Sequence, residues 1–297
     1  MAVDPQARLI ATGQDPDGYR EWNAAQLRNP PNTFDFLSTH FVVTTDNTEG
    51  KDQSPDSVAE DSFAMPVELG RRLRAMQAQI NETEFRKRAR IAFTEWLLVC
   101  CEHGMVNAPR YDNMGGAITA AGFFNMLIQN ADIVPISDMT GIIEFAGIWE
   151  KRGRVYGTPA YYTFRLYSTA QADTSVAVES DSEHYDVHHW VSRLPEITGV
   201  PYLDVVAVIN KKKDRLTIFC INRHLYQDTS ATISVNGFNA KMNGTVHCLA
   251  AASIYEGNDE VQTDLISPVE STVRVVNSQV RYTFRHESVT RIELVAR

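Results

Sequence analysis

Two segments of the sequence end a run of apolar residues on a side chain that can do chemistry. IAFTEW, residues 91–96, leads into Glu95 and Trp96, and FDFLSTH, residues 34–40, ends on His40. A carboxylate can serve as a nucleophile or a proton donor, and an imidazole can donate a hydrogen bond to a hydroxyl or a carboxylate. Position alone leaves simpler interpretations open: a surface glutamate at a strand end, and a histidine with a structural role.

The elements that must position these residues alternate between strands and helices over the first half of the chain. Polar loops are expected after Gly13 and over residues 44–62, and a helical turn or short helix over 142–149. The strands and main helices are expected as follows: strands at 8–12, 34–40, 91–99 and 131–137, a helix from about Pro66, and a helix over 115–130. Such apolar strands are typical of a parallel sheet covered on both faces. Because the C-terminal strand ends of an α/β barrel build its active site, His40 and Glu95 are expected near one such edge.

The pattern changes after Lys151 to short runs in which apolar and polar residues alternate. LDVVAVIN and RLTIFCIN flank the charged turn KKKD and predict a β-hairpin over residues 203–222. YYTFRLYST, residues 161–169, is also expected to be a strand. The second half is therefore predicted to be an antiparallel β-sandwich.

Two further clusters favour structural roles. HYDVHHW, residues 184–190, places His184 and His188 four residues apart, but the segment is expected to be strand and loop without nearby ligands of suitable spacing. We therefore expect no metal site and no cofactor. Asp112 and Asn113 precede the second helix, and capping that helix is favoured over lining a pocket.

Composition narrows the function classes. The formal net charge of −9 makes nucleic acid an unfavourable partner, and no apolar run is long enough for a membrane helix. The N-terminal residues lack a signal-peptide pattern, and the four cysteines contain no CxxC pair. A cytoplasmic protein with reduced cysteines is expected, with neither a membrane nor nucleic acid as a partner.

The whole chain, from about residue 3, resembles the C-terminal part of the family 51 α-L-arabinofuranosidases. IAFTEW resembles the strand with that family's nucleophile, and FDFLSTH resembles its strand ending on a histidine. The other matching segments, in order along the chain, are AVDPQARLIATG, AAGFFNMLIQNADIVPIS, YLDVVAVINKKKDRLTIFCINRH and HESVTRIEL. Each segment is short, and their order and spacing together make the resemblance specific.

The resemblance implies an α/β plus all-β fold: a partial (β/α)8 TIM-type barrel in residues 1–155, followed by an antiparallel β-sandwich in residues 156–297. It implies a retaining glycosidase that releases terminal arabinofuranose from an arabinose-containing carbohydrate. Carried over to this sequence, Glu95 is the nucleophile and His40 a substrate-binding residue. Trp96 is also expected to bind substrate, because its position beside Glu95 lets it offer an apolar face to a sugar.

The sequence also departs from the family pattern. The family's acid/base glutamate lies on a strand upstream of AVDP. We therefore expect this chain to lack that glutamate, which is the catalytic partner of Glu95, and the first four barrel strands. Met1 is then expected at an internal position of the family pattern. Thr94 stands where an acid is usual, Val42 where a tyrosine is frequent, and Gly141 about where a glutamine is common. Half a barrel leaves strand edges unpaired. We therefore expect little activity from the chain alone, and either a homo-oligomer or a complementing N-terminal segment. A non-catalytic carbohydrate-binding or assembly fragment is the alternative.

Overall fold

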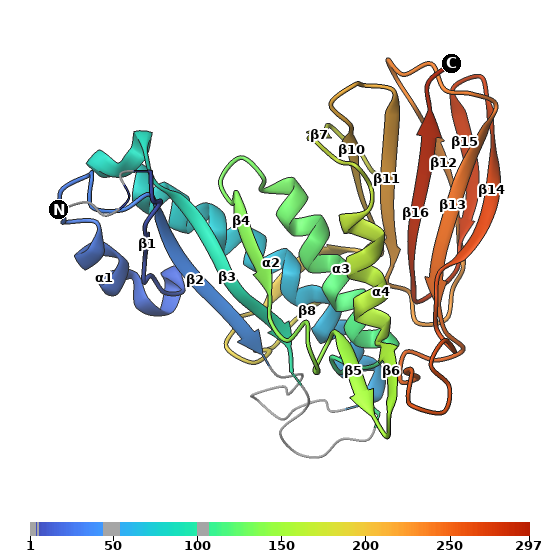
Figure 1. Cartoon of the computed structure of the whole chain (residues 1–297), viewed down its shortest axis with the longest axis horizontal. Helices are drawn as coiled ribbons and strands as arrows, with labels where there is room; N and C mark the ends of the chain where they lie inside the picture. The colour runs from blue at the N-terminus through green and yellow to red at the C-terminus, as the bar shows by residue number, and fades with distance from the viewer. Residues whose placement is uncertain (1–3, 5, 44–53, 100–106) are drawn as a thin grey trace.

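The computed structural model describes residue 4 and residues 6–43, 54–99 and 107–297. Part of the expected loop, residues 44–53, lies outside the described residues, as do Cys100, Cys101 and Glu102. Figure 1 shows two sheets with helices between them.

The first sheet is parallel and four-stranded, in the order β1-β2-β3-β4. Its strands are β1 (Ile10–Ala11), β2 (Phe36–Val43), β3 (Arg90–Leu98) and β4 (Ile136–Met139). The connecting helices are α1 (Pro16–Gln26), α2 (Pro55–Asn81) and α3 (Met114–Gln129), with the 3-10 helix η1 (Glu84–Lys87) before β3. Spatial order follows chain order, as in a (β/α)8 barrel, so the predicted partial barrel is confirmed.

The side chains on one face of this sheet form a core with α2 and α3. Leu37 and Phe41 of β2, together with Ile91 and Phe93 of β3, pack in one buried cluster with the apolar residues of these helices. The ring of Phe93 lies 6.3 Å from the ring of Phe123 in α3. The opposite face of β2 and β3 is therefore the one available for a site.

Two predictions about the N-terminal helices were wrong. Helix α2 begins at Pro55 rather than near Pro66, because the Ser54 hydroxyl caps it by accepting from the Ser57 amide. Pro66 lies inside the helix. Before it, the buried Val58 and Phe63 continue the apolar face of the helix toward its N-terminus. The segment after Gly13 was expected to be loop and contains α1, whose Tyr19 and Trp22 are exposed and so give no apolar stripe.

Two further predictions were wrong around the middle of the chain. Residues 142–149 form no helix: Gly141, Glu144 and Phe145 have positive φ, and the chain then enters the hairpin β5 (Ile148–Lys151) and β6 (Arg154–Gly157). The expected strand at 161–169 is helix α4 (Pro159–Ser168), which starts at the cap Thr158. Its aromatic residues favour a strand, but helical spacing buries Ala160, Thr163, Leu166 and Tyr167.

The second sheet has eight antiparallel strands in the order β12-β15-β14-β13-β16-β11-β10-β7, and it curls around its own core. Its strands are β7 (Thr174–Val176), β10 (Leu203–Ile209), β11 (Arg215–Asn222), β12 (Thr229–Ser234), β13 (Asn243–Ala250), β14 (Val269–Val276), β15 (Gln279–Phe284) and β16 (Ser288–Val295). The predicted hairpin over 203–222 is confirmed as β10–β11, and the β-sandwich class is confirmed with it.

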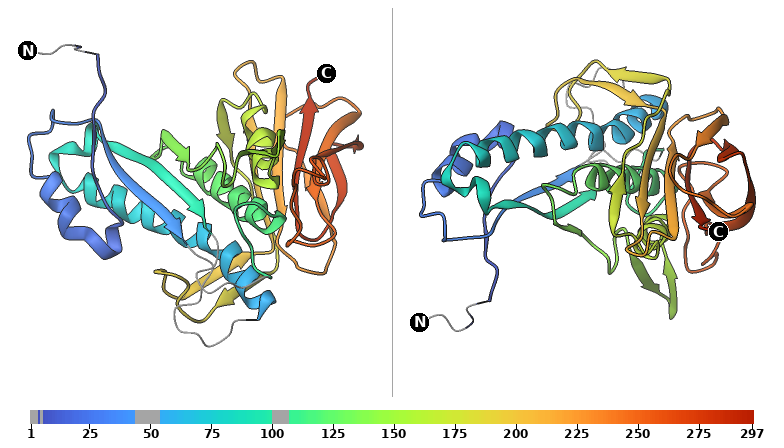
Figure 2. Two further views of the ribbon diagram at one scale, coloured as in Figure 1. Left: turned by 60° about the horizontal axis from the view of Figure 1, so that its bottom comes forward. Right: turned by 90° about the horizontal axis from the view of Figure 1, so that it is seen from above.

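Both faces of β11 are buried, which explains its unbroken apolar run. Leu216 and Ile218 point into the core enclosed by the curled sheet, whereas Phe219 and Ile221 pack against α3 and α4. The ring of Phe219 stacks on Tyr167 of α4 at 4.0 Å. Helices α3 and α4 therefore lie between the two sheets (Figures 1 and 2).

A second hairpin connects the later part of the chain to the parallel layer. Strands β8 (His184–Val187) and β9 (Ile197–Pro201) pair with each other and share the buried cluster of α2 and β2. The Tyr185 hydroxyl donates to the Glu60 carbonyl, and His189 contacts the buried carboxylate of Asp61 at 2.9 Å. Residues 184–201 thus pack on the barrel half, while the division of the chain near residue 155 stays a prediction.

A buried ion pair of the second sheet lies where α3 packs against it. The guanidinium of Arg223, 1% exposed, donates to Asp204 at 2.6 Å and to the Pro201 carbonyl. Asn125 of α3 donates to the Asp204 carbonyl and accepts from the Tyr167 hydroxyl. The pair is therefore part of a polar network within an apolar interface.

Replacing Asp204 by alanine leaves the Arg223 charge buried without its carboxylate. We expect the free energy of unfolding to fall by about 3 to 5 kcal/mol, measured by urea denaturation. The matched control is Asp132→Ala, which removes an exposed pair with Arg74 and is expected to cost at most about 1 kcal/mol. Equal losses in the two variants would contradict this assignment.

Candidate active site

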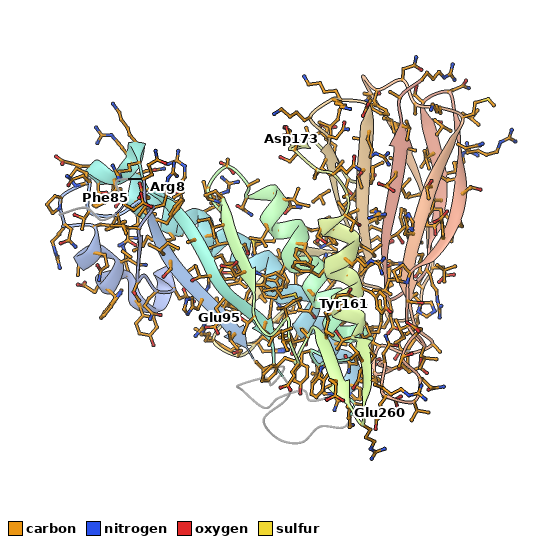
Figure 3. The ribbon with its side chains drawn as sticks, viewed as in Figure 1. Arg8, Phe85, Glu95, Tyr161, Asp173 and Glu260 are labelled. Carbon is orange, nitrogen blue, oxygen red and sulfur yellow. The ribbon has the colours of Figure 1, made fainter. Side chains whose placement is uncertain are left out.

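An imidazole and a carboxylate meet on the open face of the parallel sheet. His40 of β2 and Glu95 of β3 are paired across the two strands, and Nδ1 of His40 lies 3.2 Å from Oε2 of Glu95. Both side chains are about half exposed, 52% for His40 and 42% for Glu95. Glu95 lies in the C-terminal half of β3 (Figure 3). The two residues singled out in the sequence are thus brought together, and solvent reaches both.

A β-bulge creates this arrangement. The register pairs Thr39 with Phe93 and then His40 with Glu95, so Thr94 is an extra residue on β3. Successive residues of a regular strand point to opposite faces, whereas at a bulge two residues oppose one on the partner strand. The Thr94 hydroxyl and His40 Nε2 lie 2.8 Å apart, within hydrogen-bond distance. Both ring nitrogens of His40 therefore have a partner on β3.

The third predicted site residue, Trp96, lies on the other face of the sheet. Its side chain is 2% exposed, its ring stacks on Phe123 at 4.7 Å, and its indole N–H donates to the Ser137 hydroxyl. This geometry corrects the expectation that Trp96 offers an apolar face to a sugar, because both aromatic surfaces are covered within the core. Trp96 anchors the strand that carries Glu95.

Two residues near the site gave no signal in the sequence. Arg193, in the turn between β8 and β9, donates to the His40 carbonyl at 3.1 Å and lies 4.7 Å from the Phe41 ring centre. Asp138 of β4 is opposite Thr94 and Glu95 in the register. Because the neighbouring Ser137 bonds to Trp96 on the buried face, strand alternation directs the exposed Asp138 carboxylate to the face of Glu95. The fold brings these residues close. The sequence pattern gave no signal for them, because strand alternation predicts neither a bulge nor contact with a distant hairpin.

The remaining candidate residues have structural contacts. Asn113 caps α3 by accepting from the Gly116 amide, as favoured from the sequence, and Asp112 pairs with Arg110. His188 follows strand β8 rather than lying on a helix, and its ring contacts the Glu196 carboxylate at 2.8 Å. Within the described residues, no group of three or more histidine, cysteine or acidic side chains is placed to hold a metal ion.

Comparison with known proteins places the chain in a sequence family. A sequence family described as the alpha-L-arabinofuranosidase C-terminal domain matches residues 96–288, well over half of the chain. The chain belongs to this family. The matched region begins one residue after Glu95, so the roles of His40 and Glu95 depend on the geometry and on the sequence resemblance.

Curated proteins named as arabinofuranosidases match a larger share of the chain than this family does. The intracellular exo-alpha-(1->5)-L-arabinofuranosidase 1 of Bacillus subtilis is 22% identical over 259 residues, which cover 80% of this chain and 48% of that protein. A similar enzyme of Halalkalibacterium halodurans is 20% identical, with the same coverage. This chain therefore spans about half the length of the curated relatives it matches.

Solved structures of arabinofuranosidases share the fold. The alpha-L-arabinofuranosidase of Thermotoga maritima, solved as an arabinose complex, superposes with a TM-score of 0.84 at 24% identity, covering 98% of this chain and 58% of that one. The GH51 arabinofuranosidase of Xanthomonas axonopodis pv. citri has a TM-score of 0.79 at 19% identity, with coverage of 98% and 59%. The chain thus has the architecture of the C-terminal portion of these proteins. In its described residues no helix combines the length and apolar character needed to cross a membrane.

The buried position of Trp96 predicts a large stability effect. Trp96→Ala is expected to lower the free energy of unfolding by about 3 to 5 kcal/mol, because it leaves a cavity beneath β3. Trp96→Phe keeps a ring on Phe123 and loses the indole hydrogen bond, so its cost should be smaller and close to that of Ser137→Ala. Urea denaturation of the three variants measures this, and a Trp96→Ala variant as stable as the parent chain would contradict the packing role.

Proposed function

We propose that this chain carries the nucleophile of a retaining glycoside hydrolase that releases terminal arabinofuranose from arabinose-containing oligo- or polysaccharides. The observation that carries the proposal is the half-exposed Glu95 carboxylate, which faces an imidazole at a β-bulge in a chain of an arabinofuranosidase family. Glu95 is the nucleophile, and His40 contacts the substrate beside it. Trp96 supports β3 from below and has no direct contact with sugar.

The chemistry requires two carboxyl groups. Glu95 attacks the anomeric carbon and forms a glycosyl ester, while an acid donates a proton to the departing oxygen. The same second group, now a carboxylate, takes a proton from the water that cleaves the ester. Each of the two displacements inverts the anomeric carbon, so the released arabinose keeps the configuration of the substrate and Glu95 is regenerated.

We also propose that these 297 residues, taken alone, are impaired in the steps that need the second carboxyl group. Two observations support this: the described parallel sheet has four strands where a closed barrel has eight, and the chain spans about half the length of its curated relatives. The family resemblance places the acid/base glutamate upstream of the first strand. Residues 1–155 are then the catalytic barrel half, and residues 156–297 the β-sandwich.

A substrate whose leaving group needs no protonation tests the nucleophile independently of the acid. With 2,4-dinitrophenyl α-L-arabinofuranoside we expect a burst of about one dinitrophenolate per chain, followed by slow release, because water lacks a base to activate it. Mass spectrometry should find one pentosyl unit on the peptide that contains Glu95. Azide, which needs no base, should accelerate turnover.

The controls distinguish the possible outcomes. Glu95→Gln should abolish both the burst and the label, whereas Glu270→Gln, on the exposed strand β14, should leave them unchanged. A label on another residue, or a burst that survives Glu95→Gln, would refute the nucleophile assignment. Fast hydrolysis of the 4-nitrophenyl glycoside, lost in Glu95→Ala, would contradict the impairment and make Glu102 or Asp112 the candidate acid.

A non-catalytic carbohydrate-binding or assembly fragment is the second candidate. The incomplete barrel favours it, because residues on the open face could hold a sugar without a second group to cleave it. Saturable calorimetric binding of arabino-oligosaccharides without any covalent label would support this function in place of the first.

We further propose that the barrel half associates with a second copy of itself or with a complementing N-terminal segment. In the described sheet, β1 and β4 are edge strands, and exposed apolar side chains gather along β1 and α1 at Leu9, Ile10 and Trp22. Unpaired backbone groups beside apolar side chains favour the addition of another strand.

Sedimentation velocity tests this association. The free chain is expected to form dimers or larger species, and Ile10→Lys should shift the distribution toward monomer, because a charge at a strand edge opposes pairing. Val276→Lys, at an exposed apolar position of β14, is the matched control and should leave the distribution unchanged. A monodisperse parent monomer that melts cooperatively would count against association.

A further inference from the structure

Thr94 is the residue that the bulge adds to the site. In a regular strand its side chain would point away from that of Glu95, yet both residues reach the same imidazole ring. The Thr94 hydroxyl lies 2.8 Å from His40 Nε2, and the Glu95 carboxylate lies 3.2 Å from Nδ1. The bulge therefore holds His40 by both of its nitrogens.

The chemistry of these two contacts determines where the ring proton must lie. An ionised carboxylate has only lone pairs to present, and it would repel a lone pair on a nitrogen 3.2 Å away, so Nδ1 carries a proton where it faces Glu95. A threonine hydroxyl can donate as well as accept, so it can donate to an Nε2 that carries no proton. A carboxylate in place of Thr94 would instead require a second proton on the ring, which would make His40 a cation.

We propose that Thr94 is a positioning residue that donates its hydroxyl proton to Nε2 and holds His40 as the neutral ring with its proton on Nδ1. A neutral imidazole free in water favours the opposite tautomer, so the Glu95 carboxylate at Nδ1 and a donor at Nε2 together stabilise this state. Two further charged residues lie around His40: Arg193 donates to its backbone carbonyl rather than to its ring, and Asp138 is opposite the bulge on β4.

The consequence for catalysis rests on the proposed function. A glycosidase transition state carries positive charge on the sugar ring, and an imidazolium next to Glu95 would repel that charge. A neutral His40 still presents its Nδ1–H to the Glu95 carboxylate 3.2 Å away. Thr94 thus lets the site keep this contact without a second positive charge.

Nitrogen-15 NMR of the whole chain tests this role without relying on hydrolysis. Long-range proton–nitrogen spectra, with His40→Phe to identify the signal, should show His40 as the Nδ1–H tautomer near pH 8. Thr94→Ser should keep this pattern, and Thr94→Val should move the population toward Nε2–H. Thr94→Asp should give a ring that carries a proton on both nitrogens, because a carboxylate can only accept a hydrogen bond from Nε2.

The result that would overturn the proposal is a parent chain whose neutral His40 is mainly Nε2–H, or a Thr94→Val spectrum identical to the parent. Amide spectra and thermal melting of each variant establish that it is folded. If Thr94→Val does not fold, Thr94→Ser and the parent chain still report the tautomer. The dinitrophenyl burst then supplies a separate readout. Loss of labelling in the parent would refute Glu95 as nucleophile and leave the tautomer result intact, whereas a slower burst in Thr94→Asp than in Thr94→Ser would connect the two.

Discussion

Helix α3 is the constraint on which the two halves of this chain depend. It is buried against the parallel sheet on one side and against the antiparallel sheet and α4 on the other, so nearly every turn must be apolar or small. Gly122 shows how little room remains: a Cβ there would lie 2.9 Å from the ring of Pro66 in α2. The proline that interrupts the helical pattern of α2 and the glycine that weakens α3 are thus opposite sides of one close contact.

The same close packing gives the site its rigidity. The Trp96 ring lies against Phe123 of α3, and it fixes β3 immediately after Glu95. One strand therefore presents an aromatic anchor to the core and, one residue earlier, a carboxylate to solvent. The bulge at Thr94 makes this possible, because it places two polar side chains on the open face between two residues that face the core, Phe93 and Trp96.

Sequence reasoning recovered the features that depend on local pattern. The apolar runs of β2 and β3, the periodicity of α3 and the charged turn of the β10–β11 hairpin all carry their signal within a few residues. It failed where tertiary contacts override propensity. The aromatic residues of α4 favour a strand, and Pro66 is typical of a helix start, yet burial against α3 determines both outcomes.

The site was predictable only in part for the same reason. His40 and Glu95 end apolar runs, which is a local signal, whereas the orientation of Trp96 depends on a register shift that alternation rules do not contain. Arg193 lies 153 positions after His40 in the chain, and no spacing rule connects them. The bulge and the long-range hairpin were therefore invisible in the sequence, although each contributes a contact to His40.

The β8–β9 hairpin has a consequence for synthesis on the ribosome. Val187, Val191, Leu194 and Ile197 complete the apolar core over α2, although they are encoded more than 100 residues after that helix begins. The nascent barrel half therefore emerges with part of its core uncovered, and it can complete that core only after a segment of the second half has been synthesised. Until residue 201 has left the exit tunnel, the apolar side chains of α2 that this hairpin covers have no partner from it.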